Sequence, residues 1–279
     1  QVDVQPGVLR KELNRRVGLD DKMMTRITNL AKKDPKRIVF AEAHDLKILK
    51  AAQELSLEGI AQPILLGKED VIRKIIDTHQ LDLEGVKVVD CFHEPEKVQK
   101  YARDYYEKRK RKGVTLAEAE KLMRERNYFG SMLVEHGEAD ALISGLTKDY
   151  PKTILPALQI IGMQPKAKRV AGMYIINSKK GTFFFADTTV NANPTEEDLL
   201  GINGMTSRAV KLFGTEPRIA VLSYSNFGSS RGNVPEKAQR VVSMAREKYP
   251  DLIIDGDIQA NVAIDTSIQQ CSELIFGIL

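Results

Sequence analysis

The sequence predicts an α/β protein made of two units, and two observations lead to this prediction. In the first half of the 279-residue chain, short β-branched runs alternate with longer stretches whose apolar residues recur at helical spacing. Strands separated by helices in this way form parallel βαβ units, which assemble into an open α/β sheet. Near Gln164 the pattern changes to closely spaced strands, so we expect a domain boundary there.

The elements of the first half follow one another in a regular order. A helix from Lys22 leads into a strand over 37–41, and Asp45 is placed to cap the next helix, which Gly59 ends. Further strands are expected over 63–67, 87–90 and 139–144. Further helices are expected to begin at Glu69, Pro95, Thr115 and Pro151.

The second half opens with a predicted hairpin, formed by strands over 169–176 and 182–186. Asn193 is then expected to cap a helix, with Pro194 at its first position and Glu196 as the reciprocal acid. Two more strands are predicted over 218–225 and 252–258. These patterns divide the chain into a linker over 1–20, a first α/β lobe over 21–164 and a second α/β lobe over 165–279.

Composition restricts the partners that the chain can have. The 42 basic and 38 acidic side chains nearly cancel to +4, which suits a small anionic ligand but is too weak and too dispersed for nucleic acid. Cys91 and Cys271 are too few for a disulfide framework or a zinc site, and the four histidines show no metal-ligand spacing. No apolar stretch reaches the ~20 residues of a membrane span. We therefore expect a cytoplasmic protein without metal ligands, membrane contact or nucleic-acid partner.

A Ser- and Gly-rich segment over 221–232 is the most informative part of the sequence. It follows a predicted strand and precedes a helix that starts near Pro235. Glycines let backbone N–H groups converge on an anion, and hydroxyls and a helix N-terminus add donors. Ser229, Ser230 and Arg231 are suitable donors to a phosphate, although an ordinary strand-to-helix turn has the same composition.

Two other groups of polar residues admit two interpretations each. Asp187 and Thr188 end a strand, where open α/β sheets bind ligands, but Asp187 and Asn193 can equally serve to turn and cap the chain. Asp255 and Asp257 alternate on a strand and are expected on one face. They can hold Mg²⁺ or act as acid and base, or they can simply be a solvated strand end.

Several segments, taken in order, resemble the phosphate acetyltransferase family. They cover 37–42, 137–145, 186–191 with 193–195, and 222–225 with 255–259, within a similarity that spans roughly 22–264. The form Ser-Asn-Phe-Gly-Ser-Ser over 225–230 is similar to the variant fused behind the catalytic domains of NADP-dependent malic enzymes.

The resemblance implies two lobes of the isocitrate/isopropylmalate-dehydrogenase-like kind, with the second lobe inserted in the first, CoA between them, and dimerisation. Arg109 matches a CoA-contacting arginine of the family, although a cation at a helix end is also favourable in itself. The candidate residues for binding acetyl-CoA or CoA are Arg109, Asp187, Thr188, Ser225, Ser229, Ser230 and Arg231.

Three departures from the family pattern bear on activity. Leu155 stands where the family has an arginine, and the pattern is lost after Asp265. The segment that returns to the first lobe, which carries the family's base for the CoA thiol, would lie beyond Leu279. Losing a general base typically slows a reaction ~10²–10⁴-fold. We therefore expect that this chain lacks efficient acetyltransferase activity of its own, and we assign no catalytic residue.

The resulting expectation is an acyl-CoA-binding regulatory and oligomerisation domain, joined in cis to a malic enzyme catalytic domain. That domain would oxidise and decarboxylate malate to pyruvate with NADP and a divalent metal bound outside this chain. The alternative is a catalytic phosphate acetyltransferase, which converts acetyl-CoA and phosphate to acetyl phosphate and CoA. Leu155 favours the first interpretation, and the Ser-rich segment fits both. A scaffold that binds nothing is disfavoured by that same segment.

Overall fold

The structure is a computed structural model that describes residues 22–165, 167–178 and 181–265. Its packing divides the chain into two compact units, Gln1–Gly162 and Met163–Leu279, while the sequence predicted a boundary near Gln164. Three sequence predictions lie outside the described residues. They are the linker over 1–20, the loss of the family pattern after Asp265, and the statement about Cys271.

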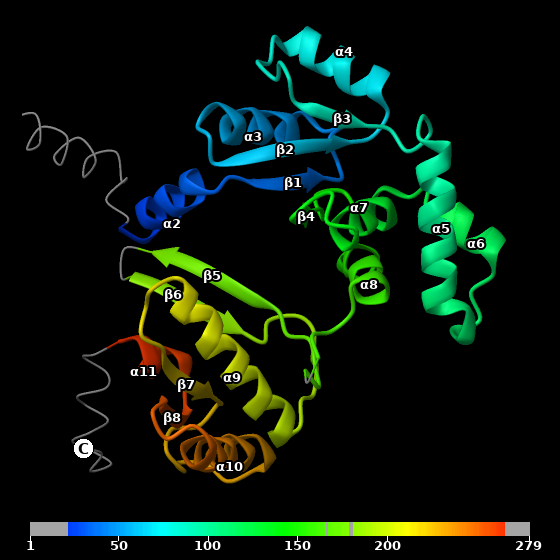
Figure 1. The fold of residues 1–279 in the computed structure, drawn as a ribbon. Coiled ribbons are helices and arrows are strands. Elements are labelled where there is room, and N and C mark those ends of the chain that lie inside the picture. The colour runs from blue at the N-terminus through cyan, green and yellow to red at the C-terminus, as the bar shows by residue number, and fades with distance from the viewer. Residues whose placement is uncertain (1–21, 166, 179–180, 266–279) are drawn as a thin grey trace, which may run out of the picture. The chain divides into compact units, whose positions relative to one another are not determined.

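A four-stranded parallel sheet forms the centre of the first unit (Figure 1). Its strands are β1 (Lys36–Phe40), β2 (Ala61–Leu66), β3 (Lys87–Val89) and β4 (Ala141–Ile143), in the order β3-β2-β1-β4. The chain moves outward from β1 through β2 to β3 and then crosses back to place β4 on the other side of β1. The strand order therefore reverses between β1 and β4, and the crevice at such a switch point is where open α/β sheets bind ligands.

The helices of the first unit pack around this sheet, and some of them carry the start signals that the sequence predicted. They are α2 (Lys22–Lys33), α3 (Leu46–Leu57), α4 (Glu69–His79), α5 (Pro95–Arg109), the short 3₁₀ helix η1 (Lys110–Lys112), α6 (Leu116–Leu122), α7 (Arg126–Glu135) and α8 (Tyr150–Ile160). The Asp45 side chain caps α3 by accepting from Lys47 N, and the Thr115 side chain caps α6 by accepting from Glu118 N. Pro95 occupies the first position of α5, as predicted.

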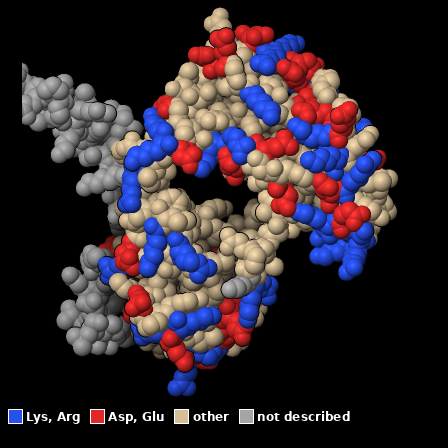
Figure 2. Space-filling view, viewed as in Figure 1, with Lys and Arg blue, Asp and Glu red and all other residues tan. Residues whose placement is uncertain are grey.

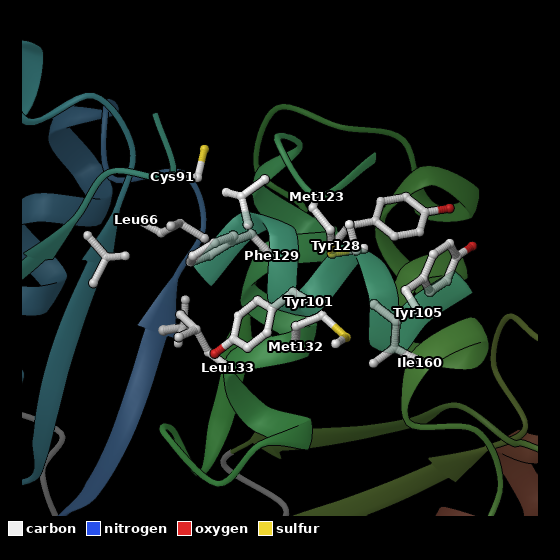
Figure 3. Packing of buried hydrophobic residues seen from close by; sticks show 14 of the residues in the cluster. Leu66, Cys91, Tyr101, Tyr105, Met123, Tyr128, Phe129, Met132, Leu133 and Ile160 are labelled. Carbon is white, nitrogen blue, oxygen red and sulfur yellow. The ribbon is translucent and has the colours of Figure 1, made fainter. Parts of the chain in front are cut away.

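Two apolar layers cover the two faces of the sheet, because successive strand residues point to opposite sides. Phe40 and Leu65 pack with residues of α3 and α4, whereas Val39 and Leu66 pack with residues of α5, α6 and α7. In the second layer the Tyr101 and Phe129 rings lie 5.3 Å apart, and Figure 3 shows them among the surrounding apolar side chains.

Helix α7 was missed by sequence reasoning, although it is the most deeply buried helix of the first unit. Residues 127–133 are all buried, so the helix has no polar face and shows little amphipathic pattern to recognise. Gly130 lets it approach the sheet, because a Cβ there would come within 2.8 Å of Leu142 Cδ1.

The second unit contains an antiparallel pair and a parallel pair of strands. The antiparallel pair is β5 (Met173–Ser178) with β6 (Gly181–Ala186), and the parallel pair is β7 (Arg218–Leu222) with β8 (Ile253–Ile258). The helices are α9 (Glu196–Leu212), α10 (Asn233–Lys248) and α11 (Ala260–Ile264). A core that includes Val221, Val241 and Ile254 joins α10 to the parallel pair.

Two boundaries in the second unit differ from the prediction. Strand β5 begins at Met173 rather than at residue 169. Helix α9 is capped by Thr195 rather than Asn193, because the Thr195 side chain accepts from Asp198 N while Asp198 accepts from Thr195 N. The Asn193 side chain instead accepts a hydrogen bond from Lys237 Nζ at 3.2 Å.

The prediction that Asp255 and Asp257 lie on one face of β8 is wrong. The register between β7 and β8 shifts by one residue near Gly256, so the alternation of side chains is interrupted. Asp255 is exposed and pairs with Arg246 at 3.0 Å, while Asp257 is fully buried. Only glycine fits between them, because a Cβ on Gly256 would lie 2.5 Å from the Val221 carbonyl oxygen.

In the part of the chain that the structure describes, none of the helices combines the length and the hydrophobicity needed to cross a bilayer.

Replacing Phe129 by Ala should lower the free energy of unfolding of the first unit by about 3–5 kcal/mol, because a fully buried ring leaves a cavity. Phe92→Ala is the control, since Phe92 is 56% exposed, and it should change stability by no more than about 0.5 kcal/mol. Urea unfolding followed by circular dichroism measures both. Equal effects of the two substitutions would contradict the packing described above.

Candidate functional site

The Ser-rich loop over 223–231 is built around one buried carboxylate. Asp257 Oδ1 accepts hydrogen bonds from Gly228 N at 3.1 Å and from Gln239 Nε2 at 2.9 Å. On the other side, Asp257 Oδ2 accepts from Ser223 Oγ at 3.4 Å. The carboxylate thus connects the loop to β8, which carries it, and to α10, which carries Gln239.

Asp257 remains ionised although it is buried. Burial raises the pKa of its carboxyl, but the hydrogen bonds that it accepts, those from Gln239 and Gly228 among them, outweigh this effect and hold the pKa below its ordinary value. Its charge is satisfied inside the protein, so Asp257 organises the loop rather than binding a ligand.

Two of the predicted serines serve the loop itself. Ser225 is 1% exposed, and its Oγ accepts from Ser230 N at 3.1 Å and lies 3.2 Å from Ser229 Oγ. Ser229 Oγ also accepts from Asn226 N at 3.1 Å. Ser229 is exposed, as are Ser230 and Arg231 at the end of the loop, directly before α10.

The chain enters α10 through a position that favours glycine. Gly232, the residue before α10, has φ +145°, and a Cβ there would lie 2.5 Å from Tyr224 Oη. The N-cap residue Gly232 has no side chain to cap this 16-residue helix, but Glu236 Oε1 in the first turn accepts from Gly232 N at 3.4 Å, and Pro235 has no N–H to donate. The N–H groups of Asn233 and Val234 remain beside Ser230 and Arg231, and they are donors of the kind that binds anions.

The segment over 187–191 forms a second loop around a carboxylate. Asp187 Oδ1 accepts from Gly172 N at 2.8 Å, and Oδ2 accepts from Asn191 N at 2.7 Å and from Asn191 Nδ2 at 2.6 Å. Burial raises the pKa of Asp187, but these bonds lower it below its ordinary value. Asp187 therefore turns the chain, which was one of its two sequence-based interpretations. Thr188 differs, since its buried Oγ1 has no hydrogen-bond partner among the described residues.

Arg109 lies in the first unit, whereas the other six predicted residues lie in the second. It is the last residue of α5, beside Tyr105, whose pKa is raised by burial and partly lowered by this arginine. The Tyr105 and Tyr128 hydroxyls both donate to Gln159 Oε1, at 2.8 and 2.7 Å. Arg109 Nε is buried without a partner among the described residues, so one of its donors is unused.

Sequence reasoning did not identify the third carboxylate-centred loop, which lies at the switch point of the first unit. Glu42 follows β1 and is 2% exposed. Its carboxylate accepts from Gly145 N at 2.8 Å, Leu146 N at 2.7 Å and Thr147 N at 2.7 Å, and also from the Thr147 hydroxyl. Burial raises the pKa of Glu42, but these hydrogen bonds lower it to about 2. A glutamate directly after a buried strand was the available signal.

No group of three or more His, Cys, Asp or Glu side chains within the described ranges is arranged to hold a metal ion.

The chain is similar to enzymes that transfer acyl groups to phosphate. The sequence profile of the phosphate acetyl/butaryl transferase family matches residues 22–272. A phosphate acetyltransferase from Clostridium acetobutylicum is 36% identical over 252 residues, which cover 87% of this chain and 74% of that protein. An NADP-dependent malic enzyme from Salmonella typhimurium is also 36% identical, over 88% of this chain but only 33% of its own length. A phosphotransacetylase from Streptococcus pyogenes has a similar structure, with a TM-score of 0.79 and 30% identity, and the match covers 89% of this chain and 75% of that one.

Replacing Asp257 by Asn should lower the free energy of unfolding of the second unit by about 2–3 kcal/mol, because a charged acceptor of several hydrogen bonds is lost. Hydrogen exchange at the Gly228 amide should become faster. Asp255→Asn provides the control, since the exposed Asp255–Arg246 pair contributes about 1 kcal/mol at most. An Asp257→Asn protein with unchanged stability and Gly228 exchange would mean that the loop is held by other contacts.

The low pKa of Glu42 makes stability depend on pH. The folded state holds this pKa at about 2 against 4.5 ordinarily, so the stabilisation is complete above about pH 4.5 and is lost as the pH falls towards 2. Glu42→Gln should be about 2–3 kcal/mol less stable than the unsubstituted protein at pH 7, and the difference should shrink on acidification. Urea unfolding between pH 3 and pH 7 tests this expectation, which a pH-independent difference would refute.

Proposed function

The chain belongs to the phosphate acetyl/butaryl transferase family, and we propose that it transfers a short acyl group between CoA and phosphate. Acetyl-CoA is the proposed acyl donor, since the chain is similar to several phosphate acetyltransferases. This proposal replaces the regulatory domain expected from the sequence as the preferred interpretation.

The observation that carries the proposal is the loop held by Asp257. Its conformation is fixed from within by Ser225, Ser229 and Gly228, and it presents the Ser230 hydroxyl and the Arg231 guanidinium at the start of α10. These donors suit a phosphate group, which can belong either to the inorganic cosubstrate or to CoA.

The proposed reaction needs positioning more than an enzyme nucleophile. A phosphate oxygen attacks the thioester carbonyl carbon, a C–O bond forms, the C–S bond breaks, and CoA leaves as its thiolate. Holding the two reactants in contact supplies much of the rate enhancement for such a step. The role of Ser230 and Arg231 is to hold a phosphate group, and the role of Asp257 is to keep their loop in place.

A second candidate function is acyl-CoA binding that regulates a fused malic enzyme. Two observations favour it. The chain matches 33% of the length of the NADP-dependent malic enzymes of Salmonella typhimurium and Escherichia coli. In addition, the exposed Leu155 stands where the family resemblance implies an arginine. In that case NADP and the divalent metal would bind to the other part of the enzyme. For either function, we propose that the protein has the isocitrate/isopropylmalate-dehydrogenase-like arrangement of lobes and forms a homo-oligomer. A cytoplasmic location is compatible with both functions.

Replacing Arg231 by Gln should weaken acetyl-CoA or phosphate binding about tenfold or more, because a charged donor at the loop is lost. Isothermal titration measures binding, and an assay for acetyl phosphate measures turnover of the same sample. Arg208→Gln, which changes an exposed arginine of α9, is the control and should leave both unchanged. Binding without turnover would favour the regulatory candidate. If Arg231→Gln binds acetyl-CoA and phosphate as tightly as the unsubstituted protein, the role assigned to the loop is refuted.

A further inference from the structure

An arginine and a histidine are in contact at the switch point of the first unit, outside the loops described so far. Arg126 is the first residue of α7, and His44 lies between the end of β1 and the start of α3. An Arg126 guanidinium N–H donates to His44 Nδ1, and both side chains are half-buried. The contact joins a side chain that is always cationic to an imidazole that can be neutral.

The hydrogen bond between these residues determines the form of the histidine. Burial lowers the pKa of His44 and the nearby Arg126 lowers it further, although Glu42 and Asp45 act in the opposite direction. A guanidinium can only donate, so Nδ1 must be the acceptor and the imidazole proton must lie on Nε2. The pair therefore offers the remaining N–H groups of Arg126 and the Nε2–H of His44, and it offers no acceptor.

The carboxylates around the pair are committed to other partners. Glu42 is bound by the loop over 145–147, and Asp45 Oδ1 accepts from Lys47 N at 2.8 Å. Asp90, near the end of β3, accepts from Phe92 N at 2.9 Å and lies 3.3 Å from His93 Nδ1. Within the described residues Arg126 forms no ion pair, so its charge is not compensated by a carboxylate of its own.

The remaining titratable neighbour is not an anion at neutral pH. Burial raises the pKa of the Cys91 thiol, and the nearby Asp90 raises it further, while Arg124 and Arg126 lower it less. The pair is therefore a set of donors with one positive charge that forms no ion pair within the described residues, placed where open α/β sheets bind their ligands.

We propose that Arg126 and His44 form a binding subsite for a phosphate group at the β1–β4 switch point. A phosphate offers several acceptor oxygens in different directions, so it can accept from the planar fork of the arginine and from the imidazole N–H together. The subsite deepens the proposed acyl transfer, on which it rests for the identity of the ligand. The phosphate group belongs either to the inorganic cosubstrate or to the nucleotide end of CoA.

The test follows the side-chain ¹⁵N signals of His44 in the full chain by NMR, with His44→Ala to assign them. The probes are inorganic phosphate and adenosine 3′,5′-bisphosphate, which carries phosphates like those of the CoA nucleotide. We expect saturable shifts of the His44 Nε2 signal with at least one probe. Arg126→Gln should weaken that binding about tenfold or more, because a charge-assisted contact is lost. Arg124→Gln changes an exposed arginine two residues away and should have no effect.

The two probes distinguish the sources of the phosphate group. A response to inorganic phosphate alone places the cosubstrate in the subsite, whereas a response to the bisphosphate alone places the CoA nucleotide there, and either result supports the proposal. His44→Ala gives independent evidence, since it should weaken binding of the same probe when measured by titration calorimetry.

Failure of the subsite and failure of the proposed function can be told apart. If the His44 signals respond to neither probe, or if Arg124→Gln and Arg126→Gln weaken binding equally, the subsite does not exist, whatever the acetyl phosphate assay shows. If the His44 signals respond as expected but no acetyl phosphate forms, the subsite is supported and catalytic transfer is not.

Discussion

An ionised carboxylate that is removed from water must be surrounded by hydrogen-bond donors, and this constraint shapes three loops of the chain. Glu42, Asp187 and Asp257 each lie at or beside the carboxyl end of a strand, and each accepts from backbone N–H groups of a loop. The donors to Glu42 and Asp187 are mainly main-chain groups, while Asp257 also accepts from the Ser223 and Gln239 side chains, so the paths of the loops are fixed with few of their own side chains. Side chains such as Ser230 and Arg231 are then left to contact a ligand.

The regular elements could be predicted because local signals and tertiary packing agree in them. Alternating strands and helices identified the parallel sheet, and Asp45 and Thr115 cap their helices as expected. The failures occur where tertiary contacts decide. Helix α7 is buried on all sides and has no amphipathic pattern. At the start of α9 the sequence offers two N-cap candidates, Asn193 and Thr195. Thr195 is the cap, because Asp198 forms reciprocal hydrogen bonds with it.

The sequence identified the segments that form the candidate site, but it could not tell which side chains in them contact a ligand and which hold the backbone. A polar residue at a strand end can bind a ligand or hold the backbone, and the pattern of the sequence is the same for both. In the structure, the side-chain oxygens of Asp187, Ser225 and Ser229 accept from backbone N–H groups, so these residues hold the loops in place. The bulge at Gly256 could have been suspected, since an isolated glycine in a strand often marks one, and it separates the environments of two neighbouring aspartates.

A loop that binds anions close to a buried carboxylate raises an electrostatic question. An uncompensated Asp257 would repel a phosphate at the loop, and the protein has no broad positive field to counter this, with a net charge of +4 and acidic and basic side chains interspersed on the face in Figure 2. The donors that surround Asp257 reduce the conflict, because these neutral groups stabilise its negative charge locally before a ligand arrives, and the Arg231 guanidinium supplies the positive charge of the loop. Recognition must then depend on preorganised local donors, which act at short range and are insensitive to the distribution of charge elsewhere.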